Sequence, residues 1–516
     1  MDTRVVEKFL GGDAHGNVTG SCKLITINIG KQRSHILNEA GMVQTRFRKT
    51  NEENLKTIDR LRPINLPQIS SIILGHTHND HCGNIPTLVK YGFDGRIFTS
   101  KESAQMLPTI FLDSARILKQ EMKYRVEKRN DKPQKDFDRS RCWGGNFDRK
   151  QRKAKASRII IDPLCEPLYD AVHAEQAANL IKNGGFNYGE WVKIEKGVDL
   201  KFYGSGHVLG SAISVLRVPR QNGFTYHGYT SDLGRDDPLV LRAANKKIAE
   251  TLSTLEMETT YGGRIHPPRE AEMGRMIEMI NRGVREKRTF IFGAFAQGRA
   301  PDLIFLLSLW MEQKLIPRIP IILDSPLATK LLETPRDYWH DPQSFFGQDR
   351  LTFNPFDPKE NKYLTLVDGQ EDSARIVRSP GPKVAVASSG MFTAGRVRNY
   401  LRDGLGNPNV TVCIVGYMAE NTLGRKLKDG QKLVNMNKQE LVVRAKIEVF
   451  DSFSAHADGP ALISFVKSVK KTDDFKIIEV HGDETEGVNF KESLMRELGM
   501  RSDQIKIPLI GEEIVL

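Results

Sequence analysis

The sequence HTHNDH at residues 76–81 follows directly on the apolar run SSIILG at residues 70–75. The apolar run predicts a buried strand, so the polar stretch is expected to form a turn at the end of that strand. In such a turn alternate side chains converge on one side. His76 and His78 can then share one metal ion, while the aspartate and the last histidine face a second. Nitrogen and carboxylate donors without thiolates are typical of a catalytic zinc site. A chance histidine-rich loop or an added tag is disfavoured, because a tag would be terminal and would not follow a strand.

Four further side chains occupy the same context, a strand that runs into a turn containing glycine or serine. They are His207 in GSGHVLGSA, Asp232 in YTSDLGR, His456 in FSAHAD and His481 in VHGDE. Taken singly, each is better explained as a hydrogen-bonded structural residue. Together with the first turn, however, they place six of the twelve histidines at strand-to-turn positions. A sheet edge concentrates functional side chains at such positions, so we expect one shared site.

The order of predicted elements indicates a β-rich layer interrupted by an α/β insertion. The first part of the chain consists mainly of alternating strands with turns. From about residue 263, helical segments such as REAEMGRMIEMINRGVREK alternate with short apolar strands such as TFIFGAF, KVAVASS and TVCIVGY. That alternation predicts a parallel sheet with helices on its faces. Near residue 440 the strand pattern returns, with AKIEVFDSFSAHAD and KIIEVHGDETEG.

Composition excludes several classes of protein. The 516 residues, 39% hydrophobic and 27% charged, are ordinary for a globular protein of about three units or two large ones. The longest apolar run, Leu303–Met311, is far below the ~20 residues that span a bilayer, so no membrane association is expected. The beginning of the chain, MDTRVVEKFLGG, lacks the apolar core of a signal peptide. Five scattered cysteines without a CxxC motif fit a reducing compartment, so we expect a cytoplasmic location and no thiolate zinc site.

The positive charge of the chain is concentrated in one segment. The formal net charge is +12, and residues 116–158 alone carry a net charge of +10. This basic insertion also contains Tyr124, Phe137, Trp143 and Phe147. Basic residues with interleaved aromatic rings can neutralise phosphates and stack on bases, which favours nucleic-acid binding. A solvated loop that keeps the protein in solution is an equally good interpretation of the segment alone.

These motifs resemble a known family. HTHNDH is similar to the HxHxDH signature of the metallo-β-lactamase superfamily, and later elements resemble the β-CASP nucleases of that superfamily over nearly the whole chain. The matching positions are Val18-Thr19-Gly20-Ser21 for the opening V-T-G-S, Glu258 in METTYGG for motif A, His456 for motif B and His481 for motif C. The segments GAFAQGRA, DSPLATK, SSGMFTAGR and GYMAENTLGRKL are also β-CASP-like. HxHxDH alone would identify only the superfamily, so the β-CASP resemblance depends on the ordered set.

The resemblance implies an α/β fold, namely an αββα metallo-β-lactamase sandwich with an inserted parallel-sheet β-CASP domain. Residues 1–262, including the basic insertion at 116–158, are expected to form the first part of the sandwich. Residues 263–445 are expected to form the β-CASP domain, and residues 446–516 the C-terminal part of the sandwich.

The resemblance also implies a ligand set and a reaction. Two zinc ions per chain are expected, one held by His76, His78 and His207, the other by Asp80, His81 and His481, with Asp232 as the bridge. Asp80 is expected to take part in catalysis as well. The family's reaction is hydrolysis of a phosphodiester bond by a hydroxide that the metals activate. His456 is then the candidate general acid, with Glu258 holding its imidazole charged and aimed.

Two details refine the expectation. RNA-processing members of the family carry histidine at motif C, whereas the DNA-repair branch typically carries valine, so His481 favours an RNA substrate. The family's first motif usually contains aspartate in a D-x-G turn, but this chain has Glu39 in Leu37-Asn38-Glu39-Ala40-Gly41. That aspartate normally orients the ligands rather than binding the metal. A longer carboxylate either serves in its place or shifts the ligating loop.

The predicted function is therefore a zinc-dependent ribonuclease acting on single-stranded RNA. A DNA nuclease of the same superfamily and a catalytically silent RNA-binding scaffold are the alternatives. Residues expected to bind RNA are Ser388, Ser389 and Gly390 at a strand-to-helix turn and Arg396 in the segment that follows it. Two further Gly-Arg pairs, at Arg299 and Arg425, are candidates of the same sort. Internal and 5′-to-3′ cleavage both stay open at this stage, as do protein partners and a homodimer.

Overall fold

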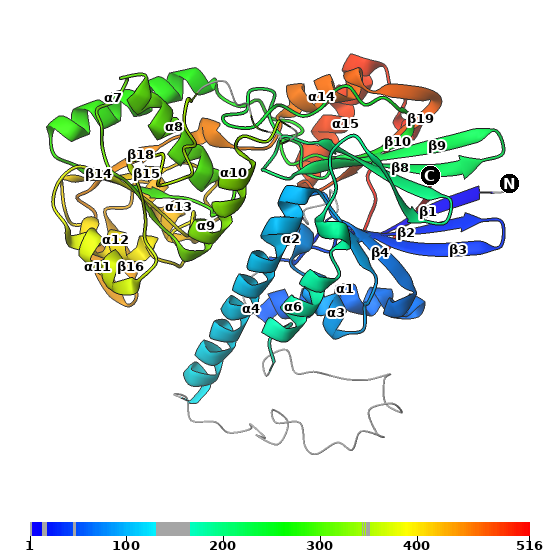
Figure 1. Ribbon diagram of the computed structural model, residues 1–516, viewed down its shortest axis with the longest axis horizontal. Helices are drawn as coiled ribbons and strands as arrows, with labels where there is room; N and C mark the ends of the chain where they lie inside the picture. Colours follow the sequence, from blue (N-terminus) through cyan, green and yellow to red (C-terminus); the bar gives the residue numbers. More distant parts are fainter. Residues whose placement is uncertain are drawn as a thin grey trace.

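The computed structural model describes residues 3–12, 18–44, 48–130, 166–342, 344, 346 and 351–516. These residues form two lobes that lie side by side, a β-sandwich with helices on its outer faces and a smaller α/β domain (Figure 1). The basic insertion predicted at 116–158 lies mostly outside the described residues. Only its beginning is described, as part of helix α4 (Lys101–Asn130).

The first sheet of the sandwich combines the two ends of the described chain. Its strand order is β21 (Glu513–Val515), β1 (Thr3–Gly11), β2 (Cys22–Ile29), β3 (Gln32–Asn38), β4 (Ile69–Ile73) and β5 (Arg96–Phe98). β1 pairs antiparallel with both β2 and β21, whereas β3, β4 and β5 run parallel. The apolar run SSIILG is therefore a buried inner strand, as its composition predicts.

The second sheet is completed by strands from either side of the inserted domain. Its order is β20 (Ile505–Lys506), β19 (Lys470–Val480), β10 (Thr251–Glu258), β9 (Gly223–Tyr229), β8 (Ala212–Arg220), β7 (Val198–Gly204) and β6 (Trp191–Glu195). β10 is the last strand before the inserted domain, and β19 comes after that domain in the sequence. The two strands nevertheless pair in parallel. The insertion thus leaves and re-enters the sandwich at neighbouring strands.

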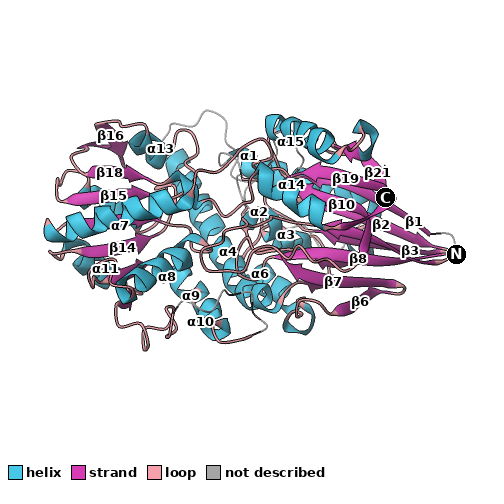
Figure 2. Ribbon diagram, turned by 90° about the horizontal axis from the view of Figure 1, so that it is seen from above, coloured by secondary structure: helices cyan, strands magenta, loops and turns pink. Residues whose placement is uncertain are grey.

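Three apolar layers hold the sandwich together. Between the sheets, side chains such as Ile25 and Ile36 of the first sheet pack against Leu200 and Leu216 of the second. The outer face of the first sheet is covered by α1 (Arg48–Leu61), α3 (Ile85–Lys90), α4 and α6 (Ala171–Asn179). Helices α14 (Gly459–Ser468) and α15 (Glu484–Leu498) lie against β10 and β19 on the other side (Figure 2). This four-layer arrangement confirms the predicted αββα sandwich.

The third sheet is parallel throughout and belongs to the second lobe. Its order is β13 (Leu364–Leu366), β12 (Ile321–Asp324), β14 (Lys383–Ala387), β11 (Thr289–Gly293), β15 (Val410–Ile414) and β18 (Lys446–Val449). Alternate residues of β11 serve opposite faces, Phe290 and Phe292 on one and Ile291 on the other. The sheet extends through β18 and so continues past the boundary expected at residue 445.

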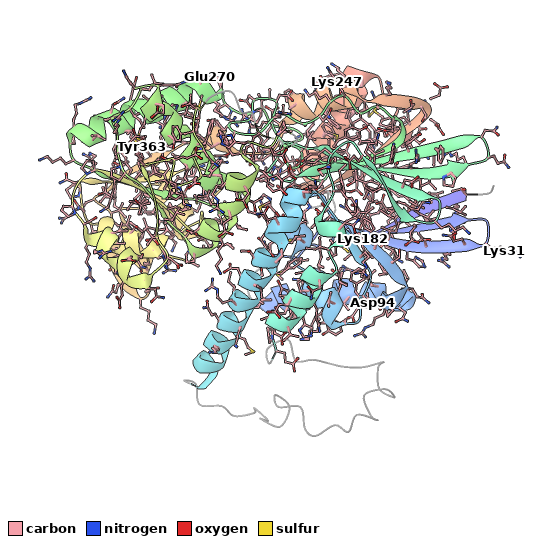
Figure 3. All side chains as sticks on the ribbon, in the orientation of Figure 1. Lys31, Asp94, Lys182, Lys247, Glu270 and Tyr363 are labelled. Atoms are coloured by element: carbon pink, nitrogen blue, oxygen red, sulfur yellow. The ribbon has the colours of Figure 1, made fainter. Side chains whose placement is uncertain are left out.

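Helices cover both faces of the third sheet. α7 (Arg269–Arg285), α8 (Arg299–Glu312), α9 (Pro326–Leu331) and α10 (Glu333–Tyr338) lie on one side, and α11 (Gln370–Arg378), α12 (Val397–Gly404) and α13 (Leu423–Lys428) on the other, with a hairpin of β16 (Leu433–Met436) and β17 (Gln439–Val442). Charged side chains such as Lys31, Asp94 and Glu270 point outward at the periphery, while other side chains fill the interior of both lobes (Figure 3). Among the described residues, no helix is both long and apolar enough to cross a membrane.

The turn that follows β3 is packed against the polar turn that follows β4. The backbone N–H groups of Ala40 and Met42 donate to the carbonyl oxygens of His81 and Asn79, at 2.9 and 2.8 Å. A Cβ atom on Gly41 would lie 1.6 Å from the carbonyl oxygen of Asp80. Only glycine fits at this contact, so the position of the second turn depends on the absence of a side chain at residue 41.

We expect Gly41→Ala to lower the free energy of unfolding by about 1–3 kcal/mol, because the added methyl group must displace backbone atoms. Gly274→Ala is the matched control, since Gly274 lies on the exposed side of α7 and a Cβ atom added there would meet no other atom within 4 Å. In a helix this change should stabilise the protein by about 0.5–1 kcal/mol. Urea-induced unfolding measures both variants, and equal stability of the two would contradict the proposed contact.

Candidate metal centre

Five turns at one edge of the sandwich bring the predicted site residues together. The 76–81 turn follows β4 and leads into α2 (Asn79–Cys82), His207 follows β7, Asp232 follows β9, Glu258 ends β10 and His481 follows β19. His456 comes from the segment between β18 and α14, and Gly234 forms a β-bridge with it. Side chains 400 positions apart in the sequence thereby meet, as His81 and His481 do at 3.1 Å.

One group of donors surrounds the Oδ2 atom of Asp232. The Nε2 atoms of His76 and His207 each lie 3.4 Å from this oxygen. The Nδ1 atom of His78 lies 3.3 Å from the Nε2 atom of His207. One donor atom from each of these four residues can be chosen so that all lie within 4.8 Å of one another, close enough to bind a single metal ion.

A second group lies on the other side of the same carboxylate. The Nε2 atom of His81 is 3.2 Å from Oδ1 of Asp232 and 3.1 Å from Nε2 of His481. The Nε2 atom of His481 is in turn 3.5 Å from Oδ2 of Asp80. Asp232 therefore presents one oxygen to each group, which is the arrangement that a bridging ligand requires. The ligand roles themselves stay a prediction.

The protonation states of the first group suit metal binding. Burial lowers the pKa of His76 and of His207, and lowers that of His78 to about 3. These imidazoles are therefore neutral near pH 7, with a lone pair available. In the described part of the chain, Nε2 of His76 and Oδ1 of Asp232 are buried without a hydrogen-bond partner. Unpaired buried donors and acceptors are costly, and a bound cation would satisfy them.

In the second group of donors, the negative charge of the carboxylates favours a positive charge beside them. Burial would lower the pKa of His81, but the carboxylates of Asp232 and Glu39 outweigh burial and raise it well above its ordinary value. Burial would likewise raise the pKa of Asp232, but the surrounding imidazoles hold it well below its usual range. A proton or a metal ion must therefore lie between these groups, and nitrogen and carboxylate donors without thiolates fit zinc.

Glu39 orients one histidine in each group. Its Oε2 atom accepts a hydrogen bond from Nδ1 of His81 at 2.6 Å, and its Oε1 atom accepts one from the Ser231 hydroxyl at 2.6 Å. Because that hydroxyl donates to Glu39, it accepts from Nδ1 of His76 at 3.0 Å. Both imidazoles thus carry the proton on Nδ1 and present Nε2 to the site. The longer carboxylate takes the orienting role that the family's aspartate implies.

A buried lysine lies close to the carboxylate of Glu39. Lys23 is 2% exposed, and its Nζ atom lies 3.1 Å from Glu256 and 3.9 Å from Glu39. Burial would raise the pKa of Glu39, but the His81 imidazole and the Lys23 ammonium outweigh it and lower the pKa to about 2. Glu39 is therefore ionised and able to accept both of its hydrogen bonds.

Thr260 has the same role for the remaining histidine of the second group. Its hydroxyl donates to the backbone carbonyl of His481 at 3.1 Å and so accepts from Nδ1 of His481 at 3.2 Å. The Nε2 atom of His481 is then left for a metal ion. Sequence patterns miss Ser231, Thr260 and Lys23, because serine and threonine are common in turns and Lys23 stands in an ordinary strand. Only their positions in the folded protein reveal their roles.

His456 and Glu258 form an ion pair beside the metal ligands. Nδ1 of His456 lies 3.1 and 3.2 Å from the two carboxylate oxygens of Glu258. Burial would lower the pKa of His456, but the carboxylates of Glu258 and Asp232 raise it to about 9. His266, which sequence patterns do not single out, donates from Nε2 to the backbone carbonyl of His456 at 3.0 Å. The imidazole is thus held in place and charged, with Nε2 on the side of the metal ligands, 3.9 Å from Oδ2 of Asp232.

The serines and arginines predicted to bind RNA already have hydrogen-bond or ion-pair partners within the protein. Ser388 shares a hydrogen bond with Ser325 at 2.8 Å, and the Ser389 hydroxyl accepts one from the Ala394 N–H. The three arginines are each paired with a carboxylate of their own domain: Arg396 with Asp324, Arg299 with Asp302 and Arg425 with Asp429. None of the three is a free cation in this structure, and their RNA-binding role stays a prediction.

The second lobe touches the metal-binding turn directly. Gln297, in the loop between β11 and α8, donates a hydrogen bond to the hydroxyl of Thr77, which stands between His76 and His78. Gln105 of α4 and Asp337 of α10 add a hydrogen bond of 2.9 Å between the lobes. The carboxyl edge of the parallel sheet therefore borders the candidate site.

Comparison with known proteins agrees with this arrangement. Residues 300–427 match the Beta-Casp domain, and residues 440–508 match the Zn-dependent metallo-hydrolase RNA specificity domain. The chain is 24% identical to "Ribonuclease TTHA0252" of Thermus thermophilus over 451 residues, covering 87% of this chain and 88% of that protein. It is 28% identical to "Transcription termination factor FttA" of Pyrococcus horikoshii over 443 residues, covering 84% of this chain and 60% of that protein. The chain therefore spans about three fifths of that archaeal relative.

We expect Glu39→Gln to weaken metal retention by about 10- to 100-fold, the usual cost of losing a partner that orients a ligand. Both groups that Glu39 binds are donors, so the amide of glutamine must turn its own N–H groups towards one of them. Glu371→Gln, at an exposed position in the first turn of α11, is the matched control. Metal content after dialysis against graded chelator concentrations measures the effect. Unchanged retention in Glu39→Gln would show that the carboxylate does not orient the ligands.

Proposed function

We propose that the chain is a member of the β-CASP family of the metallo-β-lactamase superfamily, and that it is a metal-dependent ribonuclease that hydrolyses phosphodiester bonds of single-stranded RNA. The observation that carries the proposal is the pair of donor groups that share Asp232, with the charged pair of His456 and Glu258 beside them. The match to an RNA specificity domain supports RNA as the substrate.

The metal is proposed to be zinc, two ions per chain. His76, His78 and His207 would hold one ion and Asp80, His81 and His481 the other, with Asp232 as the shared ligand. The chemistry that such a pair supplies is Lewis acidity, which lowers the pKa of water and offsets charge in the phosphoryl transition state.

The chain's own residues supply the proton for the leaving oxygen. Nδ1–H of His456 is committed to Glu258, so the transferable proton lies on Nε2. Glu258 accepts a further hydrogen bond from the backbone N–H of Leu233 at 2.6 Å, which fixes the carboxylate against the strand. His456 therefore acts as the general acid, and Glu258 keeps it protonated and aimed.

Two exposed aromatic rings support single-stranded RNA. Phe295 follows β11 and Tyr417 follows β15, and these strands are neighbours in the parallel sheet. Their side chains are 45% and 64% exposed at the same carboxyl edge that contacts the metal-binding turn through Gln297. A Cβ atom on Gly390 would lie 2.9 Å from the Phe295 ring, so the ring rests on this glycine. Unpaired bases can stack on such rings, whereas bases in a duplex cannot.

Two alternatives make different predictions. A DNA nuclease of the same superfamily would cleave DNA oligonucleotides in preference to RNA, and His481 disfavours it. A silent scaffold would bind RNA without cleaving it, although all seven expected ligands meet at one site. We also propose a cytoplasmic location, since Cys22, Cys82 and Cys413 are free thiols.

We expect Asp232→Ala to lose both bound zinc and RNA cleavage, because one carboxylate serves both donor groups. His456→Ala should keep its zinc and lose about 10²–10⁴-fold in cleavage rate, since only the proton donor is removed. The control is His173→Ala, at a histidine of the outer helix α6 that pairs with Asp170. Elemental analysis and cleavage of matched RNA and DNA oligonucleotides measure the effects. Cleavage of DNA alone, or retained cleavage in Asp232→Ala, would refute the assignment.

We expect Phe295→Ala and Tyr417→Ala each to raise KM for single-stranded RNA by about 5- to 100-fold with little change in kcat, the range for loss of one stacked base. Phe224→Ala is the matched control, since Phe224 is 51% exposed but stands at the start of β9, the opposite end from Asp232. Steady-state kinetics measure the split between KM and kcat. An RNA with abasic nucleotides has no bases to stack. If the two variants raise KM for this RNA as much as for normal RNA, base stacking is excluded.

A further inference from the structure

A cavity with several polar side chains in its walls lies away from the metal-binding groups, in the inserted domain. It has a volume of about 390 Å³ and lies between α11 and α12 on one face of the parallel sheet. Gln370, Ser373 and Arg378 line it from α11, and Arg396, Asn399 and Arg402 line it at the start of α12 and along it. The volume is within the range of small-molecule binding sites.

A buried carboxylate fixes the floor of this cavity. Asp324, at the end of β12, is fully buried and accepts hydrogen bonds from Arg396 at 2.7 Å, Ser373 at 2.6 Å and Tyr400 at 2.9 Å. Arg396 also donates to the backbone carbonyl of Val367 at 3.0 Å. The two helices are thus tied to the sheet and to each other, so the cavity is preorganised.

The walls carry polar side chains that the fold does not use. Among the described residues, the side chains of Gln370, Arg378 and Asn399 form no hydrogen bond or ion pair, and all three line the same hollow. Arg402 pairs with its neighbour Asp403, which also lines the cavity, at 2.8 Å. Asp324 neutralises Arg396, and Asp403 neutralises Arg402. The guanidinium of Arg378 therefore remains as an uncompensated positive charge beside two amide groups.

The chemistry of the lining selects a phosphate attached to a partly apolar group. A guanidinium and amide N–H groups bind phosphate oxygens, and Arg378 has free donors for two parallel hydrogen bonds. Ala374 and Val377 form an apolar stretch of the same cavity, which suits a ribose or a base. We propose that this cavity binds a nucleoside phosphate, as a unit of an RNA strand that extends beyond the catalytic centre.

The position of the cavity supports this extension, which rests on the proposed function. The turn that begins at Ser388 leads directly to Arg396, and the N–H of Val397 donates to the carbonyl of Ser388 at 2.9 Å. Strand β14, which ends just before that turn, lies beside β11, whose following loop contacts the metal-binding turn through Gln297. RNA bound at the metals would follow this edge of the sheet to Arg396 and then run along α11 and α12 to Arg378, because α11 ends at Arg378 just before β14 begins at Lys383.

The test compares Arg378→Glu with Arg375→Glu, both made in an Asp232→Ala background so that RNA is not cut. Arg375 stands on the same helix, pairs with Asp372 and does not line the cavity, so the change in net charge is identical. We expect Arg378→Glu to weaken binding of a 20-nucleotide RNA by about 10-fold or more and to reduce its salt slope by about 0.7 per lost phosphate contact. Binding of a 6-nucleotide RNA should not change. A second variant, Asn399→Asp, should act in the same direction.

Free AMP distinguishes the two sources of a nucleoside phosphate. Loss of affinity for the 20-nucleotide RNA supports the strand. If Arg378→Glu loses AMP binding but binds RNA as before, the ligand of the cavity is a free nucleotide and the proposed RNA strand is refuted. If Arg378→Glu matches Arg375→Glu for both ligands, the cavity proposal is overturned. Cleavage of the 6-nucleotide RNA by the unmodified protein tests the proposed function separately, because this RNA is too short to reach both sites.

Discussion

The buried carboxylate of Asp232 is the constraint on which the rest of the site depends. A charge 1% exposed and enclosed by imidazoles is costly unless cations lie on both of its sides. The two sheets meet this requirement by ending their strands at one edge, where five turns deliver nitrogen and carboxylate donors. The fold thus creates a site whose electrostatics favour bound positive charge, and the chemistry of the donors fits zinc.

Two further shells of side chains hold the candidate metal ligands in position. Glu39 accepts hydrogen bonds from Nδ1 of His81 and from the Ser231 hydroxyl, which in turn accepts from Nδ1 of His76, and Lys23 keeps Glu39 ionised. One carboxylate therefore sets the tautomer of a histidine in each donor group, and the two groups are coupled by their supporting hydrogen bonds as well as by Asp232. The inserted domain completes the arrangement, since its parallel sheet presents its carboxyl edge to the same turns.

Much of this could be predicted from the sequence because the ligands stand at strand ends. A strand followed by a polar turn is visible in the sequence, so the meeting of His76, His207 and Asp232 at one sheet edge could be predicted, as could the alternating helices and strands of the insertion. The roles of these three residues as ligands stay a prediction. The supporting residues could not be predicted, since a serine or threonine in a turn has many uses and a lysine in a strand gives no sign of burial. The ion pair of Arg396 with Asp324 is likewise a long-range contact, 72 positions apart, that the sequence pattern does not reveal. Only its pairing with β15 shows that β18 belongs to the parallel sheet of the inserted domain rather than to the final segment of the chain.

The central claim is that two metal ions lie on opposite sides of one carboxylate. Anomalous X-ray diffraction at the zinc edge, from crystals of the protein grown with zinc, tests it most directly. The account predicts two anomalous peaks, one among His76, His78 and His207 and one among Asp80, His81 and His481, with Asp232 between them. A single peak, or peaks bound elsewhere on the protein while this site stays empty, would contradict it.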